Sequence, residues 1–215
     1  MHTENDQRGH HNAQPYPTLS RRDPVLKKLI STIGEPNPFR FNDGGRTGED
    51  DFSALVLHMV GQQISTQVAF TLYDRLLRRV GGRLLPARVV DLEVDGLRSI
   101  GLSGNKARYV YGLASRVEDR TLILEDLRVQ SDERVLEQLT AVPGIGEWTA
   151  EMFLVFQLHR PDVMVAADIG IRTAIERCWA LSSRPAPSAV RRRAATWSPF
   201  RSYACALLWS SLRIE

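Results

Sequence analysis

Cysteine is scarce in this sequence. Its 215 residues include only two cysteines, Cys178 and Cys205. Two thiols are too few for a disulfide framework, and an iron–sulfur cluster needs four thiolates, so both kinds of site are excluded. This usage is typical of a protein that works in a reducing compartment.

Long apolar runs are also missing. No segment has the roughly 20 consecutive apolar residues that a membrane span needs, and the polar residues 1–14 do not resemble a signal peptide. We therefore expect a cytoplasmic protein that does not associate with a membrane. The composition, 43% hydrophobic and 25% charged residues, is that of a globular chain long enough for one large domain or two small lobes.

Neither sign of charge is in large excess. Lys and Arg total 28 against 25 Asp and Glu, which gives a net charge of +3 and a pI near 9.1. This balance permits a nucleic-acid partner without requiring one. Arginine dominates over lysine and suits bidentate phosphate contacts, but codon usage in a GC-rich genome explains the same bias.

Alternating strand patterns are absent, and helical periodicity runs through most of the chain. The sequence predicts an all-α fold that follows a disordered tail at residues 1–17. A loop is expected at 34–48, and the helical stretch from Asp51 to Val80 is interrupted at 61–65. Further helices are expected at 23–33, 87–91, 93–98, 104–118, 131–140, 147–158, 169–180, 187–195 and 200–213.

Residues 139–150 (LTAVPGIGEWTA) form the most informative segment. A helix is expected to end near Thr140, a tight hairpin to contain Pro143, Gly144 and Gly146, and a new helix to begin near Glu147. Two glycines let the backbone turn sharply and leave amides uncovered. Amides at a helix N-terminus favour an anion such as a DNA phosphate. A plain turn between helices is the alternative, because Gly-x-Gly alone is common.

Two further motifs follow the hairpin. Residues 161–170 (PDVMVAADIG) contain Asp168, and residues 197–204 (WSPFRSYA) combine tryptophan, proline, an aromatic residue, arginine, serine and tyrosine, with Trp209 after them. In order and spacing, the three motifs resemble the helix-hairpin-helix DNA glycosylase superfamily. Within it they are similar to the 3-methyladenine DNA glycosylase II branch, over roughly residues 50–213.

The resemblance implies two helical lobes with an active-site cleft between them. The domain would occupy residues 18–215, with a central lobe at about 85–180, in a minimal form without the N-terminal β domain of the longer bacterial relative. The expected partner is double-stranded DNA with a damaged base, bound by a monomer that requires no cofactor. The resemblance also implies a structural Na⁺ or K⁺ ion on the main-chain carbonyls of Thr140, Val142 and Ile145.

The resemblance assigns the catalytic carboxylate to Asp168. Cleavage of an N-glycosidic bond builds positive charge on the deoxyribose, which a fixed carboxylate stabilises while it orients the attacking water. An alkylated purine is already cationic and leaves without a general acid. Asp168 would also cap a helix, and Arg172 stands where it could pair with it; capping and catalysis are compatible. Glu147, Glu151 and Asp162 are weaker candidates.

Lysine is absent after Lys106. Lyase members of the superfamily carry a lysine nucleophile two residues after the second hairpin glycine, where this chain has Trp148. Schiff-base chemistry therefore has no donor at this position. We expect excision of alkylated purines, of the 3-methyladenine and 7-methylguanine type, without strand cleavage.

Aromatic residues are expected to bind the flipped base. Trp148 and Trp209 would stack on a cationic purine, with Tyr203 as a supporting donor. Met152 stands where the best-known bacterial relative has an aromatic residue, which makes this wall softer. Trp179 and Trp197 are expected in the core.

DNA contacts are expected from several segments. In the Gly-Gln-Gln-Ile-Ser turn, Gln63, with Gln62 beside it, would fill the gap left by the flipped base, or the two would bridge helices. Lys106 and Arg108 follow a second hairpin and would contact phosphate or form a solvated helix face. The remaining expected contacts are Gly144, Gly146, Thr149 and Arg201.

Two other functions fit parts of the sequence. A glycosylase for oxidised or deaminated bases would share the fold, but such relatives usually have the hairpin lysine or a four-cysteine cluster. A non-catalytic, structure-specific DNA-binding protein would use the hairpin alone. It would need neither Asp168 nor the tryptophans Trp148 and Trp209, and an Asp168→Asn variant separates it from an enzyme.

Overall fold

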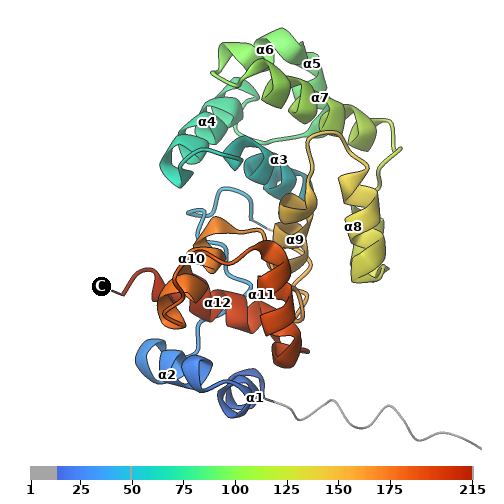
Figure 1. The fold of residues 1–215 in the computed structure, drawn as a ribbon. Helices are drawn as coiled ribbons and strands as arrows, with labels where there is room; N and C mark the ends of the chain where they lie inside the picture. Colours follow the sequence, from blue (N-terminus) through green and yellow to red (C-terminus); the bar gives the residue numbers. More distant parts are fainter. Residues whose placement is uncertain (1–13, 49, 215) are drawn as a thin grey trace, which may run out of the picture. The chain divides into compact units, whose positions relative to one another are not determined.

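Helices account for all the regular structure that is seen. The computed structural model describes residues 14–48 and 50–214, and these contain no strand, so the all-α prediction is confirmed (Figure 1). No helix in this described part has both the length and the hydropathy to cross a membrane. The helices are α1 (Pro15–Arg22), α2 (Pro24–Ile33), α3 (Asp51–Gly61), α4 (Thr66–Arg79), α5 (Pro86–Asp91), α6 (Glu93–Ser99), α7 (Gly104–Glu118), η1 (Glu125–Val129), α8 (Asp132–Thr140), α9 (Glu147–Phe156), α10 (Ile169–Cys178), α11 (Pro187–Ala194), η2 (Ala195–Trp197) and α12 (Arg201–Ser211).

The N-terminal boundary differs from the expected one. A tail was expected through residue 17, but α1 begins at Pro15. Proline suits the first helical position, and Tyr16 and Leu19 are 6% and 0% exposed, so this helix buries apolar surface that the tail prediction overlooked. The rest of the expected tail, residues 1–13, lies outside the described residues.

Short polar side chains fix where many helices begin. In each case a serine or aspartate oxygen accepts a hydrogen bond from an amide two or three residues later, which satisfies a donor that the helix itself leaves unpaired. These residues are Asp23, Asp50, Ser65, Ser103, Ser131 and Asp168. Local sequence therefore sets these boundaries directly.

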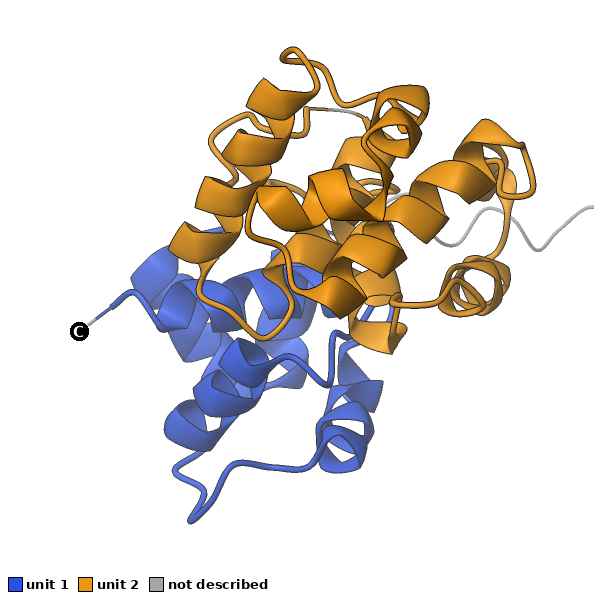
Figure 2. Ribbon diagram, turned by 90° about the horizontal axis from the view of Figure 1, so that it is seen from above, with its two compact units in different colours: residues 1–38, 161–215 blue, residues 39–160 orange. Residues whose placement is uncertain are grey.

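The chain divides into two units (Figure 2). Unit 1 combines the chain up to Pro38 with the chain from Pro161 onward, and unit 2 is Phe39–Arg160. The central lobe was expected at about 85–180, so its limits change at both ends. The reason is packing: α3 contacts α7 and α9 and so belongs to unit 2, whereas α10 packs on α12 in unit 1. The expected cleft between lobes stays a prediction.

In unit 1, the C-terminal helix α12 is the central element. It packs against α10, α2 and α1, and its side chains Ala204, Cys205 and Leu207 are all 0% exposed. Trp197 is fully buried, as expected, and its indole nitrogen donates to Asp23 at 3.1 Å. Asp23 thereby joins the N-terminal helices to the C-terminal motif.

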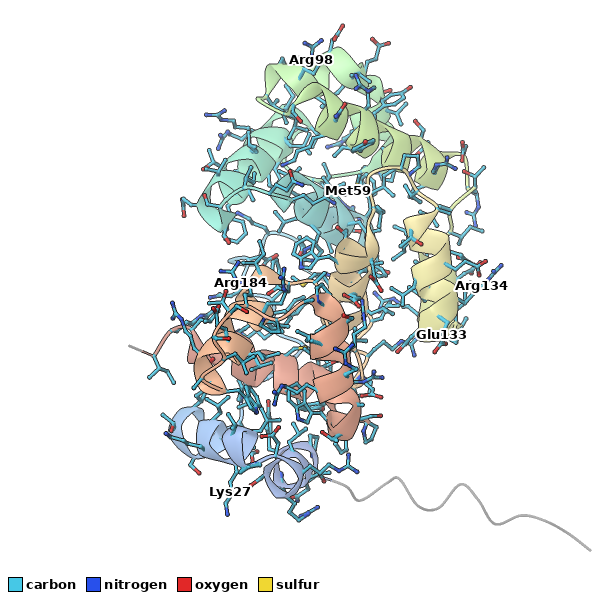
Figure 3. All side chains as sticks on the ribbon, viewed as in Figure 1. Lys27, Met59, Arg98, Glu133, Arg134 and Arg184 are labelled. Atoms are coloured by element: carbon cyan, nitrogen blue, oxygen red, sulfur yellow. The ribbon has the colours of Figure 1, made fainter. Side chains whose placement is uncertain are left out.

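In unit 2, the helix α3 is the central element. Residues 52–60 of α3 are buried without a break, as expected for a helix covered on every side. Its neighbours are α4, α7 and α9. The helices α5 and α6 pack on α7, and α8 packs on α9. Met59 of α3 is 2% exposed, whereas the long side chains of Arg98 and Arg134 extend from the outer surface (Figure 3).

Candidate functional site

Asp168 of unit 1 accepts hydrogen bonds from a helix amide and from an indole. It is the N-cap of α10, and its Oδ1 accepts from the Ile171 amide at 2.9 Å and from the Trp209 indole nitrogen at 2.9 Å. The residue is half-buried. The guanidinium Nε of Arg172, the expected alternative partner, donates to the carbonyl of Pro185 at 2.8 Å. The carboxylate is therefore oriented by a helix N-terminus and an indole.

Gly170 leaves the space that this arrangement needs. A Cβ atom at Gly170 would lie 3.0 Å from Asp168 Oδ1 and 3.5 Å from Trp209 Cδ1. Any side chain here would crowd the carboxylate oxygen and would lie against the indole. The sequence did not reveal this role, because a glycine in the first turn of a helix gives no signal of its own.

Asp162 and Arg201 form a second charged cluster in unit 1. Arg201 Nε and Nη2 donate to the two oxygens of Asp162 at 2.7 and 2.9 Å, and Ser198 Oγ donates at 2.7 Å. Burial alone would raise the pKa of Asp162, but these hydrogen bonds lower it below its ordinary value. Ser202 Oγ also accepts from the Val163 amide at 3.0 Å. Ser198, Arg201 and Ser202 thus fix residues 162–163, in the segment that leads to Asp168.

The other aromatic candidate of unit 1 lies elsewhere on α12. Tyr203 is half-buried, and its ring packs edge-on against Tyr16 of α1 and Phe200, with centroids 5.5 and 5.9 Å away. Burial raises its pKa. These contacts place Tyr203 among the rings that join α1 to α12, whereas Trp209 contacts Asp168.

The hairpin in unit 2 lies between α8 and α9, where it was expected. The Ile145 amide donates to the Val142 carbonyl at 3.0 Å, and Gly144 has a φ of +91°. Proline followed by a glycine with positive φ is the pattern of a type II turn. Gly146 is the N-cap of α9 and has no side chain to cover the first-turn amides. This end of α9 therefore has the geometry and dipole that favour an anion.

Gly144 is required for a further reason. A Cβ atom there would lie 2.4 Å from Tyr109 Cγ, which no real structure tolerates. By contrast, a Cβ atom at Gly146 would meet nothing within 4 Å, and its φ of −93° is ordinary. The two glycines thus differ: Gly144 permits the close contact with Tyr109, and a side chain at Gly146 would meet open space.

The predicted glutamine turn contacts this hairpin. Gln62 Nε2 donates to the Gly144 carbonyl and to Thr149 Oγ1, each at 2.9 Å. Thr149 is 1% exposed. Gln63 is exposed and has a left-handed φ of +57°. Gln62 therefore connects the glutamine turn to the hairpin and α9, which is the bridging role given above as the alternative. Gln63 is the exposed member of the pair.

The sequence did not predict the aromatic cluster around Trp148. Trp148 is half-buried and lies edge-on to His58, with centroids 6.2 Å apart. The His58 ring also contacts Phe41 and Phe156, at 5.0 and 6.5 Å. Burial lowers the pKa of His58 to about 4, so its imidazole is neutral at physiological pH. A histidine on the apolar face of a helix was the available signal. Met152, the other expected base contact, is 6% exposed.

The three carbonyls expected to hold a monovalent cation belong to the end of α8 and the hairpin. The Val142 oxygen accepts the turn hydrogen bond from Ile145 and keeps a second lone pair. Uncharged carbonyls are suitable ligands for Na⁺ or K⁺. The binding of such an ion by the carbonyls of Thr140, Val142 and Ile145 stays a prediction.

Comparison with known families agrees with this arrangement. The model of the family described as "HhH-GPD superfamily base excision DNA repair protein" matches residues 56–200, well over half of the chain. The chain belongs to the HhH-GPD superfamily. The match includes the hairpin, Asp168 and residues 197–200 of the motif that begins at Trp197.

Individual proteins are also similar to this chain in sequence or structure. The chain is 30% identical to YfjP of Bacillus subtilis over 168 residues, and this covers 75% of the chain and 58% of that relative. DNA-3-methyladenine glycosylase 1 of Schizosaccharomyces pombe is 27% identical over 199 residues, covering 91% and 86% of the two chains. The structure of the S. pombe 3-methyladenine DNA glycosylase in complex with abasic DNA superimposes with a TM-score of 0.83 at 26% identity, covering 94% of this chain and 98% of that one.

The two glycines of the superfamily hairpin predict separable effects. Gly144→Ala should lower the free energy of unfolding by about 2 kcal/mol or more, because its Cβ clashes with Tyr109 and its φ is positive. Gly146→Ala should change it by less than about 0.5 kcal/mol. Urea unfolding measures both. If the hairpin binds phosphate, Gly146→Ala should still weaken DNA binding, measured by fluorescence anisotropy; equal stability losses in the two variants would contradict the geometry.

His58 predicts a pH-dependent stability. Between about pH 6.5 and pH 4 its imidazole is protonated in the unfolded chain but neutral in the folded one. Unfolding therefore takes up a proton, and the folded state loses stability as pH falls through this window. From pH 7 to pH 5 the loss due to His58 should be about 2 kcal/mol.

A His58→Phe variant isolates this contribution. Asp51 complicates the wild-type profile because burial raises its pKa to about 6, which stabilises the folded state as pH falls through the same range. Both proteins contain Asp51, so the difference between their urea unfolding curves at pH 7 and pH 5 cancels it. An identical pH dependence in both would show that His58 is not buried as described.

Proposed function

We propose that this chain is a monofunctional DNA glycosylase that flips alkylated purines, of the 3-methyladenine and 7-methylguanine type, out of double-stranded DNA and hydrolyses their glycosidic bonds. The observation that carries the proposal is the Asp168 carboxylate, held by the Ile171 amide and the Trp209 indole. A structural N-cap needs only the amide. The added indole and the space left by Gly170 support a carboxylate oriented for chemistry.

Asp168 supplies negative charge where the reaction creates positive charge. As the bond from the purine nitrogen to the deoxyribose carbon breaks, the electron pair leaves with the base and the sugar becomes an oxocarbenium-like cation. A carboxylate that is already oriented stabilises this cation without reorganising. It then orients the attacking water and accepts its proton. An alkylated purine departs as a neutral base, so a general acid is not required.

The unit 2 elements support binding and extrusion of the nucleotide. The uncovered amides after Gly146 are suited to a backbone phosphate. Gln63 is exposed on a left-handed turn, which supports it over Gln62 as the residue that fills the vacated space. Trp148 offers an aromatic surface for a cationic base, with neutral His58 beside it rather than a repelling charge.

The similar relatives support the alkylated-base specificity, because the names of two of them, one from Bacillus subtilis and one from Schizosaccharomyces pombe, include DNA-3-methyladenine glycosylase. The absence of lysine at position 148 supports hydrolysis rather than lyase chemistry. A monomer in the cytoplasm, and a monovalent cation on the hairpin carbonyls, are parts of the same proposal.

Asp168→Asn tests the catalytic assignment. Asparagine keeps the N-cap and the acceptor for Trp209 but loses the charge, so release of 3-methyladenine and 7-methylguanine should fall about 100- to 1000-fold while DNA binding is retained. Released bases are measured from oligonucleotides with one lesion each, and wild type should leave the strand intact until alkali is added.

Asp95→Asn is the matched control, because Asp95 is an exposed acid with a side chain that is 92% accessible. It should act like wild type. An Asp168→Asn rate equal to wild type would show that Asp168 is not the catalytic carboxylate. Strand nicks before alkali would instead rule out the monofunctional assignment.

Trp209→Phe separates two roles of this tryptophan. Phenylalanine keeps a ring for stacking but removes the indole donor to Asp168. If orientation of the carboxylate matters, base release should fall about 10- to 100-fold, the value of one hydrogen bond to a charged group. The control is Trp179→Phe, which alters a tryptophan packed on Trp197. Unchanged single-turnover rates for Trp209→Phe would indicate that the ring alone is used.

A further inference from the structure

Lys106 faces protein carbonyls. Its ammonium, in the first turn of α7, donates to the Val60 oxygen at 2.7 Å and the Gln62 oxygen at 2.8 Å. The last carbonyls of a helix accept no hydrogen bond from an amide of that helix, and a cation there also complements the dipole. Burial lowers the pKa of Lys106. These contacts indicate a role other than the phosphate contact or the solvated helix face that were expected from the sequence.

The Gln62 carbonyl belongs to the turn of residues 61–65, which we call the probe turn, and the Val60 carbonyl lies just before it. Gln62 is extended, with φ −56° and ψ 131°, and Gln63 then reverses to a φ of +57°. A glutamine adopts this left-handed conformation only where its surroundings hold it. The Gln62 oxygen belongs to the peptide that immediately precedes Gln63. The lysine therefore fixes the backbone from which Gln63 projects.

The same region of α7 also contacts the hairpin. Tyr109, one turn after Lys106, packs so closely on Gly144 that a Cβ atom would not fit. From the probe turn, the Gln62 side chain donates to the Gly144 carbonyl. The start of α7, the probe turn and the hairpin are therefore mutually connected within unit 2 by contacts between different segments.

We propose that Lys106 is a positioning residue for base extrusion. It holds the probe turn against the hairpin. When the hairpin binds the DNA backbone, Gln63 is therefore placed at the base stack. This inference rests on the proposed function, because extrusion serves excision. It assigns Lys106 to the step that opens the duplex and not to bond cleavage.

The first experiment compares two substrates. Lys106→Met keeps the aliphatic stem but removes the donors. Single-turnover release of 7-methylguanine paired with cytosine should fall about tenfold or more, as expected for loss of charge-assisted hydrogen bonds. Release of the same lesion opposite an abasic site, which is already unpaired, should fall less than about threefold. That second rate also shows that the variant is folded.

Two variants serve as controls. Lys106→Arg keeps a charged donor and should recover most of the rate on the paired substrate. Lys27→Met removes the same charge from α2 in unit 1 and should match wild type on both substrates. Equal losses on paired and unpaired lesions in Lys106→Met would overturn the proposal.

Salt dependence distinguishes positioning from a phosphate contact. A lysine on a phosphate contributes about 0.9 to the slope of log affinity against log salt concentration. For Lys106→Met we expect the wild-type slope on undamaged duplex. A slope reduced by that amount would assign Lys106 to the phosphate backbone and overturn the proposal.

A measurement without catalysis separates this inference from the proposed function. A 2-aminopurine in duplex DNA becomes brighter when it is unstacked, so saturating wild-type protein should raise its fluorescence and Lys106→Met should give less than half of that rise. If wild type releases no base from any lesion, the glycosylase proposal fails, and this measurement still decides the role of Lys106. Equal rises in both proteins, or no rise with wild type, would overturn the inference.

Discussion

The carboxylate of Asp168 occupies a place that a helix start would give any capping aspartate, but its second donor comes from the far end of the chain. The Ile171 amide and the Trp209 indole both reach Oδ1, and Gly170 leaves room for them. A charged group held by fixed dipoles needs little reorganisation when positive charge develops nearby. The packing of α10 against α12 in unit 1 therefore orients the Asp168 carboxylate.

The surrounding residues maintain this arrangement. Asp162, bound by Arg201 and Ser198, ties the segment before Asp168 to the start of α12, the helix that carries Trp209. A mutation in this ion pair would thus act on Asp168 through the backbone. In unit 2, Lys106 and Gln62 have a comparable role, because they connect the probe turn to the hairpin. Polar residues that look like ligands in the sequence thus serve as structural links.

Much of the fold follows from local sequence. Apolar periodicity and serine or aspartate caps place most helices within two residues of their observed ends, because both signals act over three or four residues. The Pro-Gly turn of the hairpin is equally local. The helix α1 was not predicted, because its stability depends on the burial of Tyr16 and Leu19 against distant parts of unit 1. Two apolar residues in an eight-residue helix give no strong periodic signal.

The sequence by itself determined the all-α class, the hairpin, the position of Asp168 before a helix and the absence of a lysine at position 148. Only the tertiary structure decided which partners the polar and aromatic side chains take. Arg201 pairs with Asp162, Lys106 with backbone carbonyls, and Trp148 with a neutral His58. Caps and turns arise from neighbours along the chain, whereas these pairs join residues 39 to 90 positions apart, and only the packing of helices brings them together.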